Sequence, residues 1–512
     1  MSPTPLRRRA IVAVASFAVL GTTCFAGTAS AATAAEPVST PVPIVTPEGV
    51  VFSYILNAKH ANQGQVNLVS RAVEKAGGVV VQAWPEIGVV VAHSNRAAFR
   101  ADVTAEARGA LESVGASRTV GVTEGTPDGV STPWDKNALK YRPAPKKVNG
   151  DVPGQLAPAP ATGDPRETEQ WDMKMIKADQ AHKITDGSRN VLVGVLDSGI
   201  DPTHPDLQAN IDVANSVNCT DAGRPDLSST GWYDSKAPGG YHGTHVAGTI
   251  AAARNGIGIV GVAPNVRLAS VKVVNEDGFI YPEYAVCGFV WAGLKHMDVT
   301  NNSYYVDPFM YYCEDQPDQY AAKEAVRKAV AWSIKQGVVS AAAAGNASTD
   351  LANNTTDTTS PDDSTPITRT INSGCHDIPA ELDGVATVSS VQRYPAGTSD
   401  FRLSSFSNRG LGVIDVAAPG SSILSTLPRT TAASGYGLLN GTSMASPHVA
   451  GVLALMKSVH PTWTPAQMLA KLRQQADDKA CSVATAGPAC VGPVTDNSYF
   501  GEGLVDALDA VS

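Results

Sequence analysis

The segment Val191–Ile200, with the sequence VLVGVLDSGI, decides the fold of this chain. Its first six residues form an unbroken apolar run, which is the pattern of a parallel strand buried on both faces. Asp197 and Gly199 follow the run at once. Ligands of parallel sheets bind at the carboxyl ends of the strands, so Asp197 is the first candidate functional residue.

Similar apolar runs recur along residues 166–512 and alternate with helical stretches. Strands are predicted at 191–196, 268–274, 299–301, 338–343 and 385–391, and helices at 283–295, 321–335, 443–459 and 465–474. This alternation predicts an α/β fold with a parallel sheet that is covered by helices on both faces.

Polar groups stand at the ends of these predicted strands or at the starts of helices. Besides Asp197 they are His242 in HGTHVAG, Asn346 after AAAAG, and Ser443 in NGTSMASP. A hydroxyl nucleophile needs a base, the base needs an acid that fixes its tautomer, and the tetrahedral intermediate needs fixed donors. All four kinds of group are present, which indicates nucleophilic catalysis.

Four sequence blocks give the chain, from about residue 170 to its end, a resemblance to the subtilisin-like serine proteases (subtilases, peptidase S8). They are DSGID at 197–201, HGTH at 242–245, AAGN at 343–346 and GTSMASPH at 441–448, in the order of that family. The resemblance implies a subtilisin-like parallel sheet and a serine endopeptidase that hydrolyses peptide bonds through an acyl-enzyme on Ser443.

The same resemblance implies a role for each polar group. Ser443 would attack the substrate, His242 would act as general base and Asp197 would orient His242. Asn346 would be the side-chain donor to the oxyanion, and in a family member the loss of this asparagine costs about 10²–10³ in rate. His245 lies one helical turn after His242 and is expected to be structural.

The first 31 residues have the pattern of an export signal. Three arginines at 7–9 precede an apolar run at 10–20 that is too short to span a bilayer, and Ala29-Ser30-Ala31 suits a signal peptidase. Residues 1–31 are therefore predicted to be a signal peptide of a secreted, extracellular protein, and a membrane anchor is the weaker interpretation.

Residues 32–125 predict a small domain ahead of the catalytic one. Strands are expected at 51–56, 79–83, 87–92 and 118–122, and helices at 65–76 and 96–108. This α+β unit resembles the ferredoxin-like propeptide of the family, an inhibitor and intramolecular chaperone. The proline-rich stretch 126–165 would be the linker that is cut during maturation, and 166–512 the catalytic domain. A permanent N-terminal binding domain is the alternative.

Six cysteines remain after the signal peptide, an even number in a chain predicted to enter an oxidising compartment. Six cysteines allow fifteen pairings. Proximity along the chain favours Cys481 with Cys490, and less strongly Cys219 with Cys287 and Cys313 with Cys375. Free buried thiols are the alternative.

A structural calcium site is a further implication of the resemblance. Asp206 and Asn255, the latter in the loop 253–259, would supply side-chain oxygens, with Glu167 as a weaker candidate. Against this, Arg254 lies inside the loop, and Asp206 could be an ordinary capping carboxylate. No catalytic cofactor is expected, because the sequence has neither a phosphate-binding glycine loop nor His-Glu-x-x-His.

The resemblance also assigns the substrate cleft. Its predicted lining is Gly278, Phe279, Ile280, Ser303, Tyr304, Tyr305, Ala343, Ala344 and Gly345. Bulky residues stand where the family commonly has glycine or leucine, so they either narrow the cleft or pack against the segment 306–319. The pocket at the scissile bond is expected to be neutral and apolar, unless Glu314 and Asp315 fold over it.

Composition limits the partners. The formal charge is −9 and 17% of residues are charged, so nucleic acid is not an expected partner. We expect a monomer that binds protein or peptide substrates, with its own propeptide as inhibitor. Two alternatives remain: a processing protease of narrow specificity, and a catalytically silent protein that only binds.

Overall fold

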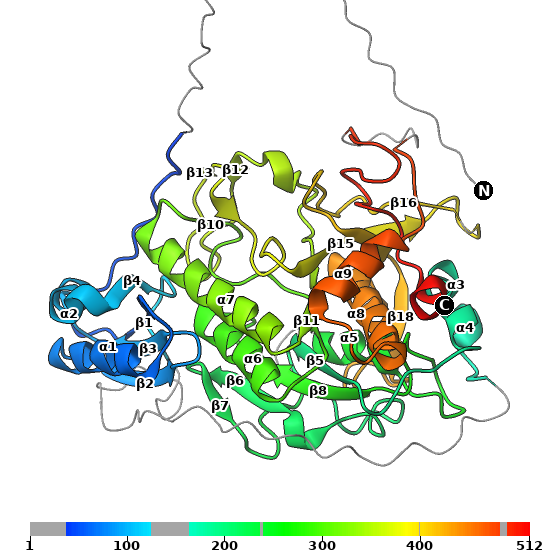
Figure 1. The fold of residues 1–512 in the computed structure, drawn as a ribbon, viewed down its shortest axis with the longest axis horizontal. Coiled ribbons are helices and arrows are strands. Elements are labelled where there is room, and N and C mark those ends of the chain that lie inside the picture. Colours follow the sequence, from blue (N-terminus) through cyan, green and yellow to red (C-terminus); the bar gives the residue numbers. More distant parts are fainter. Residues whose placement is uncertain (1–36, 124–162, 236–238, 399, 482–488) are drawn as a thin grey trace, which may run out of the picture. The chain divides into compact units, whose positions relative to one another are not determined.

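The computed structural model describes residues 37–123, 163–235, 239–398, 400–481 and 489–512 (Figure 1). The predicted signal peptide and residues 126–162 of the predicted linker lie outside this part of the chain. Elements are named below as they are labelled in Figure 1.

The strand predicted from the segment 191–200 is β5 (Leu192–Asp197), in the interior of the main sheet. It pairs in parallel with β8 (Arg267–Lys272) on one side and β9 (Val299–Asn302) on the other. Within the described residues this nine-stranded sheet has the order β16-β15-β11-β9-β5-β8-β6-β7, and β17 also pairs with β15. The other strands are β6 (Val217–Asp221), β7 (Arg224–Asp226), β11 (Val339–Ala343), β15 (Val385–Arg393), β16 (Phe401–Leu403) and β17 (Val416–Pro419). Among the strands that the structure describes, only β7 and β16 join this sheet antiparallel, so the predicted parallel sheet is confirmed.

Helices cover both faces of the sheet. α6 (Pro282–Leu294) and α7 (Pro317–Lys335) share a core with Leu196, whereas α5 (His242–Ala251) and α8 (Thr442–Val459) share one with Val195. Neighbouring residues of β5 thus enter opposite cores, as the period of a strand requires. The remaining helices are α3 (Trp171–Met175), α4 (Ala178–Ala181), α9 (Pro465–Gln474) and α10 (Ala507–Val511). Over the described residues, no helix combines the length and apolarity needed to cross a membrane.

A second, antiparallel sheet precedes the main one and has the order β2-β3-β1-β4. Its elements are β1 (Phe52–Ala58), α1 (Gln63–Lys75), β2 (Val79–Trp84), β3 (Val89–Ser94), α2 (Phe99–Ala107) and β4 (Leu111–Ala116). One face carries Tyr54 and packs against Val69 of α1 and Phe99 of α2. The other face carries Ile55 and Trp84, which belong to the same core as α6 and α7.

The strand predicted at 118–122 is wrong, because the last strand of this sheet is β4. The strand β4 contains small and polar residues, such as Ser113 and Gly115, in place of the alternating apolar residues from which a strand is predicted. Gly115 is needed there, since a Cβ would lie 2.6 Å from the Cα atom of Asp318 in α7. Just past β4, Arg118 forms an ion pair with Glu283 of α6.

Polar contacts fix the small sheet against α6 and α7. The Asp318 carboxylate accepts a hydrogen bond from the amide of Ala116 (2.7 Å), and Asn57 donates to the carbonyl of Ala321 (2.8 Å). The Arg118 and Glu283 side chains are 2% and 0% exposed. A buried charge without a partner is very unfavourable, so this ion pair couples the two parts of the protein.

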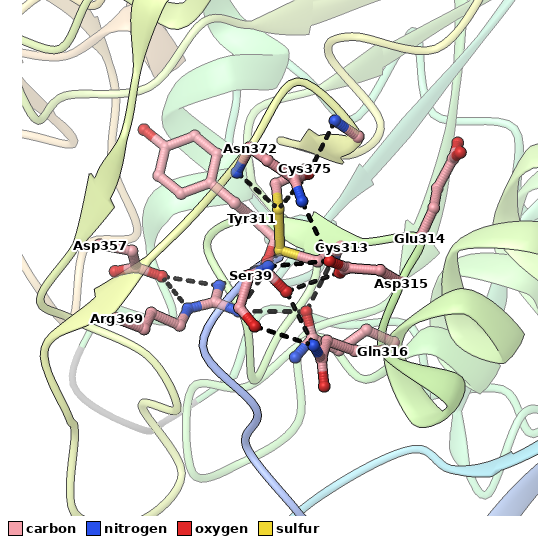
Figure 2. The surroundings of a disulfide bond; sticks show 12 residues. Ser39, Tyr311, Cys313, Glu314, Asp315, Gln316, Asp357, Arg369, Asn372 and Cys375 are labelled. Carbon is pink, nitrogen blue, oxygen red and sulfur yellow. Dashed lines mark hydrogen bonds and ion pairs between the residues drawn. A yellow bond between two sulfur atoms is a disulfide. The ribbon is translucent and has the colours of Figure 1, made fainter. Parts of the chain in front are cut away.

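The three favoured cysteine pairings are confirmed: Cys219 with Cys287, Cys313 with Cys375, and Cys481 with Cys490. The second of these joins the two-residue strands β10 (Tyr312–Cys313) and β14 (Cys375–His376), as Figure 2 shows. Two further hairpin-like pairs are β12 (Thr356–Asp357) with β13 (Arg369–Thr370) and β18 (Ile423–Thr426) with β19 (Tyr436–Leu439).

We expect Arg118→Ala to destabilise the full-length chain strongly. The substitution leaves Glu283 buried without its cation, which costs about 3–5 kcal/mol. The measurement is the Tm by calorimetry, in a Ser443→Ala background that removes the predicted nucleophile. The control is the double variant Arg118→Met/Glu283→Gln, which removes both charges and should recover most of the loss. Equal losses in both proteins would show that packing, and not the ion pair, carries the effect.

Candidate active site

Asp197 and His242 meet because β5 ends where α5 begins. Nδ1 of His242 lies 2.9 Å and 3.0 Å from the two carboxylate oxygens of Asp197. Asp197 is buried, and the amide of Ser198 also donates to its Oδ1 (2.7 Å). A hydrogen bond at Nδ1 leaves Nε2 of His242 as the nitrogen that can accept a proton.

The two histidines of the HGTH block have opposite environments. Burial disfavours the charged form of His242, but the negative charge and the hydrogen bond of Asp197 outweigh it, so the pKa of His242 is raised. His245 is fully buried, and its Nε2 lies 3.1 Å from the carbonyl of Ile423. Burial, with the nearby His242, lowers the pKa of His245 to about 3. His245 is thus a neutral packing residue, as expected.

Ser443 lies in the first turn of α8, where amides have no acceptor within the helix. Its hydroxyl donates to the carbonyl of Ser303 (3.3 Å). Pro447, four residues on, has no N–H to offer the Ser443 carbonyl. The hydroxyl of Ser303 donates to that carbonyl instead, at 2.9 Å, and so ties the end of β9 to the start of α8.

Asn346 follows β11 and is oriented by α8. Its Oδ1 accepts hydrogen bonds from the amide (2.8 Å) and the hydroxyl (2.9 Å) of Thr442. The amide nitrogen Nδ2 is therefore turned away from Thr442 and is available as a donor. Gly345 precedes it with φ of +95°, and a Cβ there would lie 2.4 Å from the side chain of Asn408. Only glycine fits this turn.

A cavity of about 390 Å³ opens beside Ser443 and Asn346. Eight of the nine predicted cleft residues line it: Gly278, Phe279, Ile280, Ser303, Tyr304, Tyr305, Ala343 and Gly345. A second cavity of about 230 Å³, lined by Asp197 and His242, shares Gly278, Ile280, Ser303 and Tyr304 with the first. The cleft thus extends to both sides of the Ser303 segment.

Ala344 is the predicted cleft residue that does not line the cavity. It is fully buried, and its amide donates to the carbonyl of Val388 in the neighbouring strand (3.0 Å). The two tyrosines have both an exposed and a buried role. They line the cavity, and the hydroxyl of Tyr305 also donates to the carboxylate of Asp362 (2.8 Å).

The larger cavity has acidic residues in its lining that the sequence did not predict. Asp307, Asp362 and Asp377 line the larger cavity, and none was predicted. The acids that were considered, Glu314 and Asp315, lie elsewhere: the first pairs with Lys323 (2.8 Å), and the second accepts from the amide and hydroxyl of Ser39 (Figure 2).

The family model described as "Subtilase family" matches residues 188–503. The chain belongs to the subtilase family. Subtilisin E of Bacillus subtilis (strain 168) is 36% identical to this subtilase over 340 residues, 66% of this chain and 70% of that protein. The chain is accordingly a serine protease that acts on protein or peptide substrates.

Two solved structures share the fold of this subtilase. Epidermin leader peptide processing serine protease from Staphylococcus aureus has a TM-score of 0.62 at 21% identity, covering 90% of this chain and 98% of that one. Fervidolysin from Fervidobacterium pennivorans, described as a keratinolytic enzyme related to subtilisin, has a TM-score of 0.61 at 23% identity, covering 91% of this chain and 61% of that one.

The predicted calcium ligands of this subtilase lie next to each other. Oδ1 of Asp206 accepts from the side-chain amide of Asn255 (3.3 Å), and its Oδ2 accepts from the hydroxyl of Tyr436 (2.8 Å). Glu167, the weaker candidate, instead pairs with Arg254 (2.7 Å). Within the described ranges, no group of three or more His, Cys, Asp or Glu side chains is arranged to hold a metal ion.

One carboxylate at this loop was not predicted. Asp164 is 4% exposed, and its carboxylate accepts from the backbone amides of Asn255 and Gly256. With Asp206 and the amide oxygen of Asn255, it gives the loop a set of hard oxygen donors, the kind that Ca²⁺ prefers.

The pH dependence should follow the raised pKa of His242. General base catalysis needs the neutral imidazole, so kcat/KM should fall on the acid side with a midpoint above the ordinary histidine value. In Asp197→Asn the negative charge that raises the pKa is lost, so the midpoint should move to lower pH. NMR titration of the imidazoles in Ser443→Ala protein, with and without Asp197→Asn, measures this directly. His245 is the internal control and should stay neutral from pH 5 upward; an unmoved His242 midpoint would contradict the assignment.

Proposed function

We propose that this subtilase is a secreted, monomeric serine endopeptidase that is made as an autoprocessed zymogen, with Ser443, His242, Asp197 and Asn346 as its catalytic groups. The observation that carries the proposal is the Nδ1 contact of His242 with Asp197, at 2.9 Å, beside a serine at a helix start and a fixed asparagine. A protein that used the cleft only for binding would not need all four.

In this mechanism Nε2 of His242 takes the proton of Ser443 as Oγ attacks the carbonyl carbon of the scissile bond. The charge on the oxygen is stabilised by Nδ2 of Asn346 and by the amide of Ser443. His242 then protonates the leaving amine, which leaves an acyl-enzyme. Water, deprotonated by His242, releases the acyl group and restores Ser443.

The position of residues 52–122 supports the zymogen part of the proposal. Beyond β4, the amide of Thr119 donates to the carboxylate of Asp363 (2.9 Å), next to the cavity residue Asp362. The chain therefore leaves the small sheet beside the cleft, where an inhibitory propeptide would enter it. Export is supported by the pattern of residues 1–31 and by the three disulfides.

A dedicated processing protease is the second candidate. The observation that favours it is the bulk of Ile280 and Tyr304, which line both cavities, and of Phe279, which lines the larger one. Digestion of casein at many sites would count against it.

Ser443→Ala should block maturation and labelling together. We expect the wild-type chain to lose its N-terminal part on expression in a protease-deficient host, and the variant to stay at the size of the uncut precursor. A fluorophosphonate probe should label wild-type protein at Ser443 and leave the variant unlabelled. Ser446→Ala, a buried serine on the same helix, is the control and should still be cut and labelled. A variant that reaches mature size would disprove autoprocessing.

Calcium is proposed as a structural ligand of the loop 253–259, held by Asp206, Asn255 and Asp164. Addition of chelator should then lower the Tm of the protein, because a ligand that binds only the native state stabilises it. In Asp206→Asn the difference between calcium and chelator should shrink, whereas the exposed Asp383→Asn should keep it. Identical melting curves with and without chelator would refute the site.

A further inference from the structure

We propose that the larger cavity is a cation pocket that binds the side chain of an arginine or lysine immediately before the scissile bond. This assignment rests on the proposed function and deepens it by naming a substrate class. The carboxylates that carry it are Asp307, Asp362 and Asp377.

The cavity is next to the reacting atoms and is lined by three carboxyl groups. Ser443, Asn346 and Ser303 form its side toward the nucleophile, so the side chain bound there belongs to the residue whose carbonyl is attacked. The three carboxylates come from separate segments of the chain. None of the residues that line this cavity is a lysine, an arginine or a histidine.

Asp377 is the central residue of the proposal. It is 2% exposed, and its Oδ1 is buried without a hydrogen-bond partner. Its Oδ2 points toward the catalytic side of the cavity, since a Cβ atom on Gly345 would lie 3.4 Å from it. A carboxylate that is buried and unpaired is costly to a folded protein, and a cation that enters from the cleft removes that cost.

Asp307 and Asp362 add two more carboxyl groups to the lining. The side chain of Asp307 is buried and accepts from the amide of Ile280, and that of Asp362 accepts from Tyr305; the two carboxyl groups also share a hydrogen bond with each other. Burial first, and then the charge of Asp362, raise the pKa of Asp307 well above its usual range; burial likewise raises that of Asp377, with Glu381 adding to it. Without a cation the pocket is driven toward the protonated, neutral state.

The surroundings match a long cationic side chain better than a metal ion. Among the described residues, these carboxylates are not arranged as a metal site. Phe279 and Tyr304 in the same lining can supply apolar walls for the methylene stem of such a side chain. A planar guanidinium can bind two carboxylate oxygens at once, so arginine should be preferred to lysine.

A covalent link holds the acids in place. Asp377 follows Cys375 by two residues, and Asp307 precedes Cys313 by six. The disulfide between these cysteines thus fixes the two segments that carry the acids, and Arg369 packs beside it, bonded to Asp357 (2.8 Å; Figure 2). A site fixed in this way can discriminate between side chains of similar size.

The test uses fluorogenic peptides that differ only in the residue before the cleaved bond: arginine, lysine, citrulline or leucine. Citrulline has the shape of arginine without its charge. The protein is the product of the full-length chain, and kcat/KM is expressed per active site titrated with a fluorophosphonate. We expect arginine to exceed citrulline by about 100-fold, the scale of a buried charge pair. Equal rates for arginine and citrulline, or a preference for leucine, would overturn the pocket while the proposed protease function stands.

Asp377→Asn tests the residue itself, with the exposed Asp383→Asn as a control of equal charge change. We expect the first variant to lose most of the arginine over citrulline preference and the second to keep it; an unchanged preference in Asp377→Asn would overturn the role of Asp377. On unmodified protein, benzamidine should inhibit competitively and neutral benzamide should not, and equal effects would contradict the assignment. Absence of both labelling and hydrolysis would overturn the proposed function, and this inference with it.

Discussion

The pairing of parallel strands around β5 is the constraint on which the rest of the molecule depends. Because β9, β5 and β11 run in one direction, the residues that follow them reach the same edge of the sheet. Asp197, Ser303 and Asn346 are therefore brought together from distant parts of the sequence. The apolar runs of these strands have to be buried on both faces, and the two helical layers that bury them also carry the remaining groups.

The helix α8 joins the core to the chemistry. Its apolar residues fill the core under the sheet, and its first turn holds Ser443 and fixes Asn346 through Thr442. The proline inside the helix removes one internal hydrogen bond, and Ser303 replaces it from β9. Packing in the core and orientation at the site are therefore not independent, since a shift of α8 along the sheet would disturb both.

The features that could be predicted from the sequence are those specified by short continuous segments. The run 191–196 and the blocks around His242, Asn346 and Ser443 each specify an element and the polar residue at its end, so fold and candidate site followed together. The strand β4 was missed because its pairing with β1 and its contact with Asp318 favour small residues over the usual β-formers. Asp307, Asp362 and Asp377 were missed for a different reason. They are distant in sequence and have no common pattern, and only the folding of the segments around the Cys313–Cys375 disulfide brings them to one cavity.

Buried charged residues in this protein are of two kinds: those that pair inside the molecule and support the fold, and those that line the cavity beside Ser443. Where a charge supports the fold it has its partner inside the molecule, as Glu283 has Arg118 and Asp357 has Arg369. Such pairs repay the loss of hydration and need nothing from outside. Asp377 is of the second kind, because it is buried about as deeply but, among the described residues, forms no ion pair, and it lines the cavity beside Ser443. A buried carboxyl group without a cation, on a cavity beside the nucleophile, is a place where a cationic side chain of the substrate can complete the pair.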